Sequence, residues 1–210
     1  MNWEDECYLL SKKKFRENAN IINVFTPNKG RVTGIVYGGN SRKIRNYLQI
    51  SNKLFVFNNS KSDNKLGYFK TELIKAISPI YFNDKERTSA LISLCSLLNS
   101  LLPESQPYKN IYNSFEKLIS TLNLDSWIIL YIFFEINLIK ELGYDTNLSV
   151  YDDTSKNIGD LKKIKIDAYN YEVPSFLIKQ KIPNDIEKLL VKKSLVFTRS
   201  VLLNKFFIPN

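Results

Sequence analysis

The residues of this chain whose types and spacing suit a chemical task are the cations near its start. Residues 11–46 contain nine Lys and Arg side chains but a single acid, Glu17. The nine are Lys12, Lys13, Lys14, Arg16, Lys29, Arg31, Arg42, Lys43 and Arg45. Cations gathered on the loops and strand ends of a small β domain neutralise a phosphate backbone. This stretch therefore favours nucleic acid as the partner, with these nine residues as the candidates that bind it.

The positive charge of the chain is unevenly distributed. Residues 1–80 hold 14 Lys and Arg against 6 Asp and Glu, a balance of +8, whereas residues 81–210 hold 16 against 15, a balance of +1. A basic part joined to a neutral part indicates a division of labour. A solvated, merely cationic surface is the alternative interpretation.

Three aromatic residues accompany the basic stretch. Phe15 lies within the first basic run, and Tyr37 and Tyr47 flank the second. Bases stack on exposed rings, and each contact contributes about 1–3 kcal/mol. We expect Phe15 in a hydrophobic core. We add Tyr37 and Tyr47 to the candidate binding residues, with the core as their alternative position.

Several kinds of catalytic site are missing from the sequence. There is no histidine, which excludes Ser-His and Cys-His nucleophilic sites and histidine metal sites. Cys7 and Cys95 are too far apart in sequence for a Cys-x-x-Cys pair, and the segment 38–43 has the wrong length for a phosphate-binding P-loop. We expect no enzyme activity, no catalytic residue and no bound metal.

Five runs rich in β-branched and aromatic residues precede residue 76. They cover residues 7–12, 19–25, 31–37, 49–57 and 66–74. Turn-forming residues separate them, including a tight hairpin at Pro27–Gly30. Five strands in about seventy residues predict a small closed barrel, of which the OB-fold is the common nucleic-acid-binding example. An SH3-like barrel would give the same pattern.

Helical periodicity begins after Pro79. The first predicted helix starts near an N-cap at Asn83 or Asp84 and ends at Pro103. A second opens near Pro107, and a third, apolar nearly all round, runs from about residue 126 to Gly143. Residues 144–182 are irregular, with a short β pair near 165–171. Helical spacing returns at 185–207.

These residues resemble a known family. Residues 1–10, 24–31 and 36–43 are similar to the amino-terminal domain of the bacterial recombination mediator RecO. Residues 134–144 and 195–207 resemble two of its helices. The resemblance implies an α+β fold: a five-stranded OB-fold β-barrel at 1–79, followed by a mostly α-helical C-terminal domain at 80–210. The irregular insert at 145–182 holds no cysteine. The four-cysteine zinc site of many family members is therefore not expected here.

The resemblance also implies a function. RecO proteins are non-enzymatic mediators of DNA repair and recombination that bind single- and double-stranded DNA and anneal complementary strands. With RecR they load RecA onto DNA coated by single-stranded-DNA-binding protein, whose acidic tail they bind. We hypothesise that the nine cations line one face of the barrel, and that Arg87, Lys109 and Lys117 contact the tail.

Location and alternative functions follow from the same sequence. The acidic start, the short apolar runs and the two cysteines predict a cytoplasmic protein. The resemblance implies that this protein is bacterial and associated with the nucleoid. Two other functions suit the same basic barrel. One is an RNA-binding module of translation or ribosome assembly, and the other is an adaptor for an acidic protein.

Overall fold

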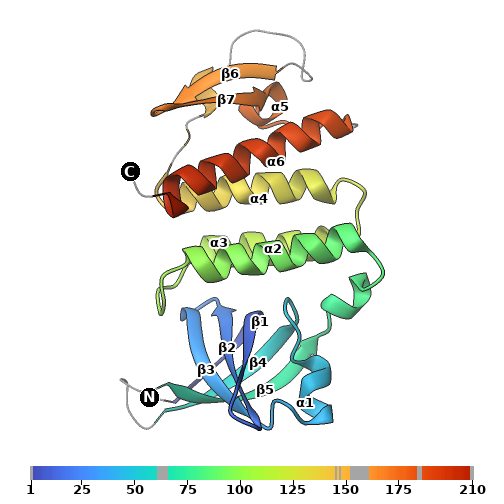
Figure 1. The fold of residues 1–210 in the computed structure, drawn as a ribbon, viewed down its shortest axis with the longest axis vertical. Helices are drawn as coiled ribbons and strands as arrows, with labels where there is room; N and C mark the ends of the chain where they lie inside the picture. Colours follow the sequence, from blue (N-terminus) through green and yellow to red (C-terminus); the bar gives the residue numbers. More distant parts are fainter. Residues whose placement is uncertain are drawn as a thin grey trace. The chain divides into compact units, whose positions relative to one another are not determined.

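A computed structural model describes residues 2–60, 66–144, 146, 148–151, 161–183 and 186–208. The chain divides into two compact units, Met1–Asn113 and Ser114–Asn210. The first unit therefore extends beyond the boundary predicted at residue 79, and it includes the first long helix. Figure 1 gives the order of the elements along the chain.

Five strands of the first unit form a closed barrel. They are β1 (Trp3–Phe15), β2 (Ala19–Thr26), β3 (Gly30–Tyr37), β4 (Lys53–Asn59) and β5 (Gly67–Lys75). The barrel order is β1-β2-β3-β5-β4, and β3 and β5 pair in parallel over a short stretch. This confirms the predicted five-stranded barrel, and the arrangement is consistent with an OB-fold. Buried and less buried positions alternate along β4, which places Leu54 and Val56 in the core.

Strand β1 serves two neighbours. Its first half pairs with β4, from Trp3 opposite Asn58, and its second half pairs with β2 as far as Phe15 opposite Ala19. A bulge near Leu9 separates the two halves. The strand is therefore longer than the predicted run 7–12, and Lys13 and Lys14 are strand residues. Phe15 is half-buried at its end and not in the core, which corrects our expectation.

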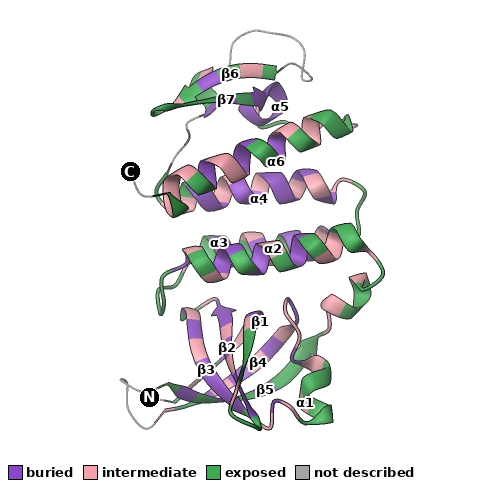
Figure 2. Cartoon of the chain, in the orientation of Figure 1, coloured by how far each residue is buried: buried purple, intermediate pink, exposed green. Residues whose placement is uncertain are grey.

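The basic segment after β3 is partly helical rather than a loop. Helix α1 covers Arg42–Tyr47, and the Ser41 hydroxyl accepts a hydrogen bond from the Ile44 backbone N–H at 3.4 Å. Ser41 is thus the N-cap, which stops the preceding turn and starts the helix. In Figure 2 this helix is mostly exposed.

The long helix of the first unit is α2 (Lys85–Leu101). Asp84 caps it by accepting from the Arg87 backbone N–H at 3.0 Å, and it ends just before Pro103. Both limits agree with the sequence prediction. A short helical turn, η1 (Ser78–Tyr81), links the barrel to α2. Helix α3 (Lys109–Thr121) crosses the division between the units.

The second unit contains α4 (Trp127–Glu141), α6 (Lys188–Leu202) and a two-stranded sheet of β6 (Leu161–Ile166) and β7 (Tyr169–Pro174). Shorter helical segments complete it: η2 (Leu148–Tyr151), α5 (Ser175–Ile178) and η3 (Leu203–Phe207). Helix α4 is buried along much of its length, as its sequence predicts, and Gly143 follows it with a φ of +92°. The predicted β pair is confirmed and is longer than expected.

One carboxylate lies in the core of the second unit. Glu135 of α4 accepts a hydrogen bond from the Thr198 hydroxyl of α6 at 2.5 Å and forms an ion pair with Arg199 at 2.6 Å. Burial raises the pKa of Glu135, and Arg199 partly opposes that effect. These contacts join α4 to α6 without a metal. Among the residues that the structure describes, no group of His, Cys, Asp and Glu is arranged to hold a metal ion.

Candidate nucleic-acid interface

The nine cations of the basic stretch gather at two ends of the barrel. Strands β2 and β3 pair from Ala19 opposite Tyr37 to Thr26 opposite Gly30. Seven residues of strand separate these pairs, about 23 Å at 3.3 Å per residue. Lys29 and Arg31 therefore lie far from Arg16 and the turn after Tyr37. The nine cations thus do not form one cluster, and the hypothesis that they line one face of the barrel stays a prediction.

The other seven cations lie around the β1–β2 turn and helix α1. They are Lys12, Lys13, Lys14, Arg16, Arg42, Lys43 and Arg45, which together we name the basic end. Glu17 is the only acid within this sequence stretch. In the described part of the chain, no ion pair neutralises any of the seven. Their charge is thus available to an external anion.

Hydrogen bonds join the two loops of the basic end into one surface. The Gly38 N–H donates to the Asn18 carbonyl at 2.7 Å, and the Asn40 side chain donates to the Glu17 carbonyl at 2.8 Å. Gly38 has a φ of +67°, a conformation that side chains disfavour, so glycine suits this turn. The bonds hold the β1–β2 turn against the start of α1.

Lys12 and Arg45 connect strand β1 to α1. The Lys12 Nζ donates to the Leu48 carbonyl at 2.7 Å, just beyond the end of α1. Burial lowers the pKa of Lys12, and the nearby positive charge of Arg45 lowers it further. The basic end therefore holds mutually repelling cations in place, and an anion that binds there relieves the repulsion.

The aromatic candidates have different positions. Tyr37 is 54% exposed and stacks on Tyr68 of β5, with the ring centroids 5.2 Å apart. Tyr47 instead packs against the barrel core, and its hydroxyl donates to the Thr71 carbonyl at 2.7 Å. The Arg16 guanidinium lies 5.1 Å from the Phe15 ring centroid. Of the two tyrosines proposed from sequence, Tyr37 presents its ring to solvent and Tyr47 has a structural contact.

Sequence reasoning missed Tyr68. It is 43% exposed and lies opposite Ile35 in the parallel pairing of β5 with β3. Alternation along Gly67-Tyr-Phe-Lys70 was the available signal, because Phe69 is buried and its neighbours on the strand therefore face outward. The strand order that brings Tyr68 beside Tyr37 was not visible in the sequence.

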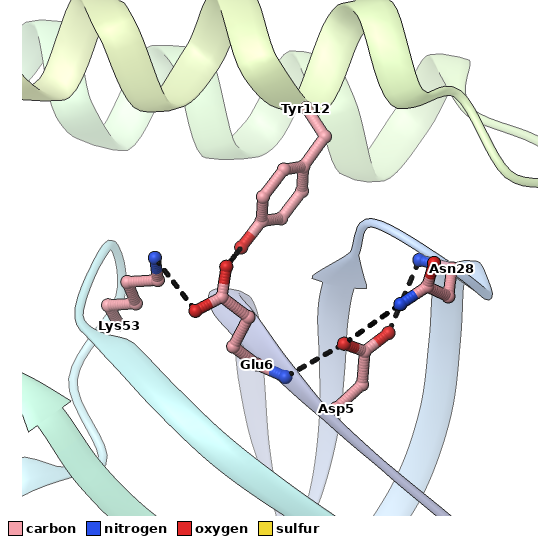
Figure 3. Close-up of polar contacts among 5 residues, drawn as sticks. All are labelled: Asp5, Glu6, Asn28, Lys53 and Tyr112. Carbon is pink, nitrogen blue, oxygen red and sulfur yellow. Dashed lines mark hydrogen bonds and ion pairs between the residues drawn. The ribbon is translucent and has the colours of Figure 1, made fainter.

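The opposite end of the barrel mixes cations with acids. Lys53 pairs with Glu6 at 3.1 Å, and Glu6 also accepts from the Tyr112 hydroxyl at 3.3 Å (Figure 3). Asp5 accepts from the backbone and the side chain of Asn28, in the hairpin that carries Lys29. We call Asp5, Glu6, Lys29, Arg31 and Lys53 the mixed end.

Arg31 is engaged within the fold. Its Nε donates to the buried carbonyl of Leu102 at 2.7 Å, and its own carbonyl accepts from the Ser105 N–H at 2.8 Å. Gly30 beside it has a φ of +70°, and a Cβ there would lie 1.8 Å from the Gln106 carbonyl oxygen. The hydrogen bonds of Arg31 therefore hold the β2–β3 hairpin against the segment that follows α2.

The three candidate tail-binding residues have different surroundings. Arg87 pairs with Asp84 at 2.6 Å, and hydrogen bonding to Arg87 lowers the pKa of that carboxyl. Lys109 begins α3 and is exposed, and Lys117 is exposed eight positions later. Arg87 and Lys109 belong to the first unit and Lys117 to the second. Their role in tail binding stays a prediction.

Comparison with known proteins decides the family. Residues 1–77 match the domain described as Recombination protein O N terminal, and residues 83–161 match Recombination protein O C terminal. The chain belongs to the RecO family. The resemblance seen in the sequence is thereby confirmed.

Curated relatives of the family carry the name DNA repair protein RecO. The chain is 32% identical over 151 residues to that of Wolbachia sp. subsp. Drosophila simulans, which covers 71% of this chain and 62% of the relative. It is 32% identical over 149 residues to the Cereibacter sphaeroides protein, with the same coverage, and 32% identical over 145 residues to that of Roseobacter denitrificans, covering 69% and 60%. The matched part thus spans about three fifths of each relative. Among the described residues, no helix has the length and apolar character to span a bilayer.

Proposed function

We propose that this chain is a DNA-binding protein of DNA repair that uses the basic end of its barrel to hold DNA backbones. The observation that carries the proposal is the cluster of seven cations with one acid, around two turns that hydrogen bonds hold together. A backbone interface needs fixed positive charge and no base-specific code. Membership in a family whose relatives are named DNA repair proteins supports DNA as the polyanion.

The mechanism we propose is strand annealing by charge neutralisation. Two complementary strands repel each other through their phosphates, and cations that bind both backbones lower that repulsion. The bases then pair without a bond-making step, so the proposal assigns no catalytic residue. The proposal requires no cofactor, and the absence of cysteine from residues 145–210 supports a protein without the four-cysteine zinc site expected of many family members.

The partners we propose follow the family. They are RecR, RecA, and single-stranded-DNA-binding protein, from whose coated DNA this chain would help to load RecA. The proposed tail contact uses Arg87, Lys109 and Lys117, and the proposed location is the bacterial cytoplasm and nucleoid. A labelled acidic tail peptide titrated against Arg87→Ala and Lys109→Ala variants tests the contact, and unchanged affinity in both would place it elsewhere.

An annealing assay tests the proposed function directly. Labelled complementary oligonucleotides, bare or coated with single-stranded-DNA-binding protein, should pair faster when the full chain is added. If about six phosphates are engaged, log K should fall with log salt at a slope of roughly −4 to −5. Absent annealing together with a flat salt response would overturn the proposal. Tighter binding of RNA than of single-stranded DNA of equal length would instead favour a translation module.

A further inference from the structure

The stacked pair Tyr37 and Tyr68 is an exposed aromatic surface at the outer face of β3 and β5. The rings are 28° from parallel, and each is more than two-fifths exposed. The two rings cover part of each other, and the rest of their exposed area is open to a ligand. Exposed aromatic rings beside a charged surface suit a flat ligand, which can stack on them.

A cation accompanies the rings. The pKa of Tyr37 is raised by hydrogen bonding to Tyr68, whereas the positive charge of Arg16 acts in the opposite direction. The strand register agrees: Phe15 lies opposite Ala19 and Ala19 lies opposite Tyr37, so the turn that begins at Arg16 lies beside Tyr37. A flat π surface beside a guanidinium suits a nucleotide, whose base stacks while its phosphate pairs with the cation.

The surface on the far side of Tyr68 is different. Phe57 of β4 lies opposite Lys70 of β5 and opposite Glu4 of β1, and the Lys70 Nζ is 5.3 Å from the Phe57 ring centroid. Lys70 also pairs with Glu72 at 3.2 Å. Aromatic rings are present here too, but carboxylates offset the cations and disfavour phosphate.

We propose that Tyr37 and Tyr68 form a base-stacking subsite for unpaired DNA, which continues the basic end and stops at the carboxylates of Glu4 and Glu72. The inference rests on the proposed function, because it needs a DNA strand held at the basic end. In a duplex, both faces of every internal base are covered by its neighbours. Only an unpaired base offers a free face to the rings, so the subsite makes the barrel distinguish single strands from duplex.

The test compares variants of the full chain on two DNA probes. One probe is a labelled oligothymidylate, and the other is a covalently closed dumbbell duplex without free ends, both measured by fluorescence anisotropy. Tyr68→Ala should weaken oligothymidylate binding about tenfold and change dumbbell binding less than about twofold. Tyr68→Phe keeps the ring and should keep the affinity. Phe57→Ala, on the neighbouring strand beside the carboxylates, is the matched control and should leave both affinities unchanged.

Each outcome decides the matter. Unchanged oligothymidylate binding in Tyr68→Ala overturns the subsite, and equal weakening of both probes overturns its selectivity. A Phe57→Ala loss as large as that of Tyr68→Ala overturns the boundary at the carboxylates. If the unmodified chain binds neither probe, the proposed function itself has failed. A triple variant with Arg42, Lys43 and Arg45 all changed to Ala separates the two proposals. If it loses its affinity for both probes while Tyr68→Ala keeps its affinity for both, the proposed function stands and the subsite does not.

Discussion

The two ends of the barrel both contain lysines and arginines, but the neighbours of these cations differ. At the basic end seven cations share the stretch with one acid, whereas at the mixed end Lys53 pairs with Glu6 and the hairpin of Lys29 is bonded to Asp5 through Asn28. A cation with a carboxylate partner stabilises its own fold, and a cation among cations attracts an outside anion. The surroundings of each residue therefore decide its role, more than its presence in a basic stretch.

Arginine makes the contrast clear. Arg31 donates to a buried carbonyl and fixes a hairpin, so its planar donor group is used inside the molecule. Arg42 and Arg45 lie on the short exposed helix α1. The same guanidinium group thus stabilises the fold at one end of the barrel and, in the proposed function, binds phosphate at the other.

The largest effect is expected from removing charge at the basic end. A variant with Arg42, Lys43 and Arg45 all changed to Ala should bind DNA at least about thirtyfold more weakly, because up to three phosphate contacts are lost. Its salt slope should become shallower by about 2–3. Anisotropy titrations over a range of salt measure both quantities.

Stability provides the control for that variant. All three side chains are exposed, so the free energy of unfolding, measured by thermal denaturation, should stay within about 0.5 kcal/mol of the value for the unmodified chain. Full DNA affinity in a folded triple variant would show that α1 is not part of the interface.

A different effect is expected at the mixed end from Arg31→Ala. The change leaves the buried carbonyl of Leu102 without its donor, so we expect a loss of about 1–3 kcal/mol of unfolding free energy. Urea unfolding measures this loss. DNA affinity of the folded fraction should be unchanged. A strong loss of affinity without a loss of stability would place Arg31 in the interface after all.

Much of the first unit was predictable because the limits of its elements are local. The hairpin at Pro27–Gly30, the cap at Asp84 and the stop at Pro103 depend on residues a few positions apart. The extension of β1 through Lys14 was not predictable in this way, since only pairing with β2 holds a run of lysines as a strand. Tertiary pairing overrides a weak local preference there.

The candidate site was predictable in composition but not in arrangement. The basic stretch identified all seven residues of the basic end, yet it joined them to Lys29 and Arg31. The predicted hairpin already separates them, because pairing of strands 19–25 and 31–37 places residue 29 at the end of the barrel opposite residue 37. The pairing of Tyr37 with Tyr68 depends on the contact of β3 with β5, which links residues far apart in the sequence.

A smaller effect is expected from the partial burial of Lys12 and its crowding by Arg45. Because the pKa of Lys12 is lowered in the folded state, the folded chain releases this proton first as the pH rises. In the window between the lowered pKa and the ordinary lysine pKa, the unfolded chain binds more protons, so stability should rise with pH. The free energy of unfolding of the unmodified chain minus that of Lys12→Met, measured by urea unfolding over a range of pH, isolates this contribution. A difference that falls with rising pH would contradict the proposed crowding.

The smallest changes in DNA affinity give the sharpest comparison, because they compare one exposed lysine from each end of the barrel. Lys43→Ala removes one cation from a surface with almost no acids, so DNA binding should weaken about two- to fivefold and the salt slope should fall by about 1. Lys29→Ala removes the same group from a hairpin bonded to Asp5, and we expect a change of less than about twofold. Both variants change the net charge by one, so a long-range effect of charge alone would weaken them equally. Equal losses would mean that the barrel attracts DNA as a whole, and unequal losses would locate the DNA at the basic end.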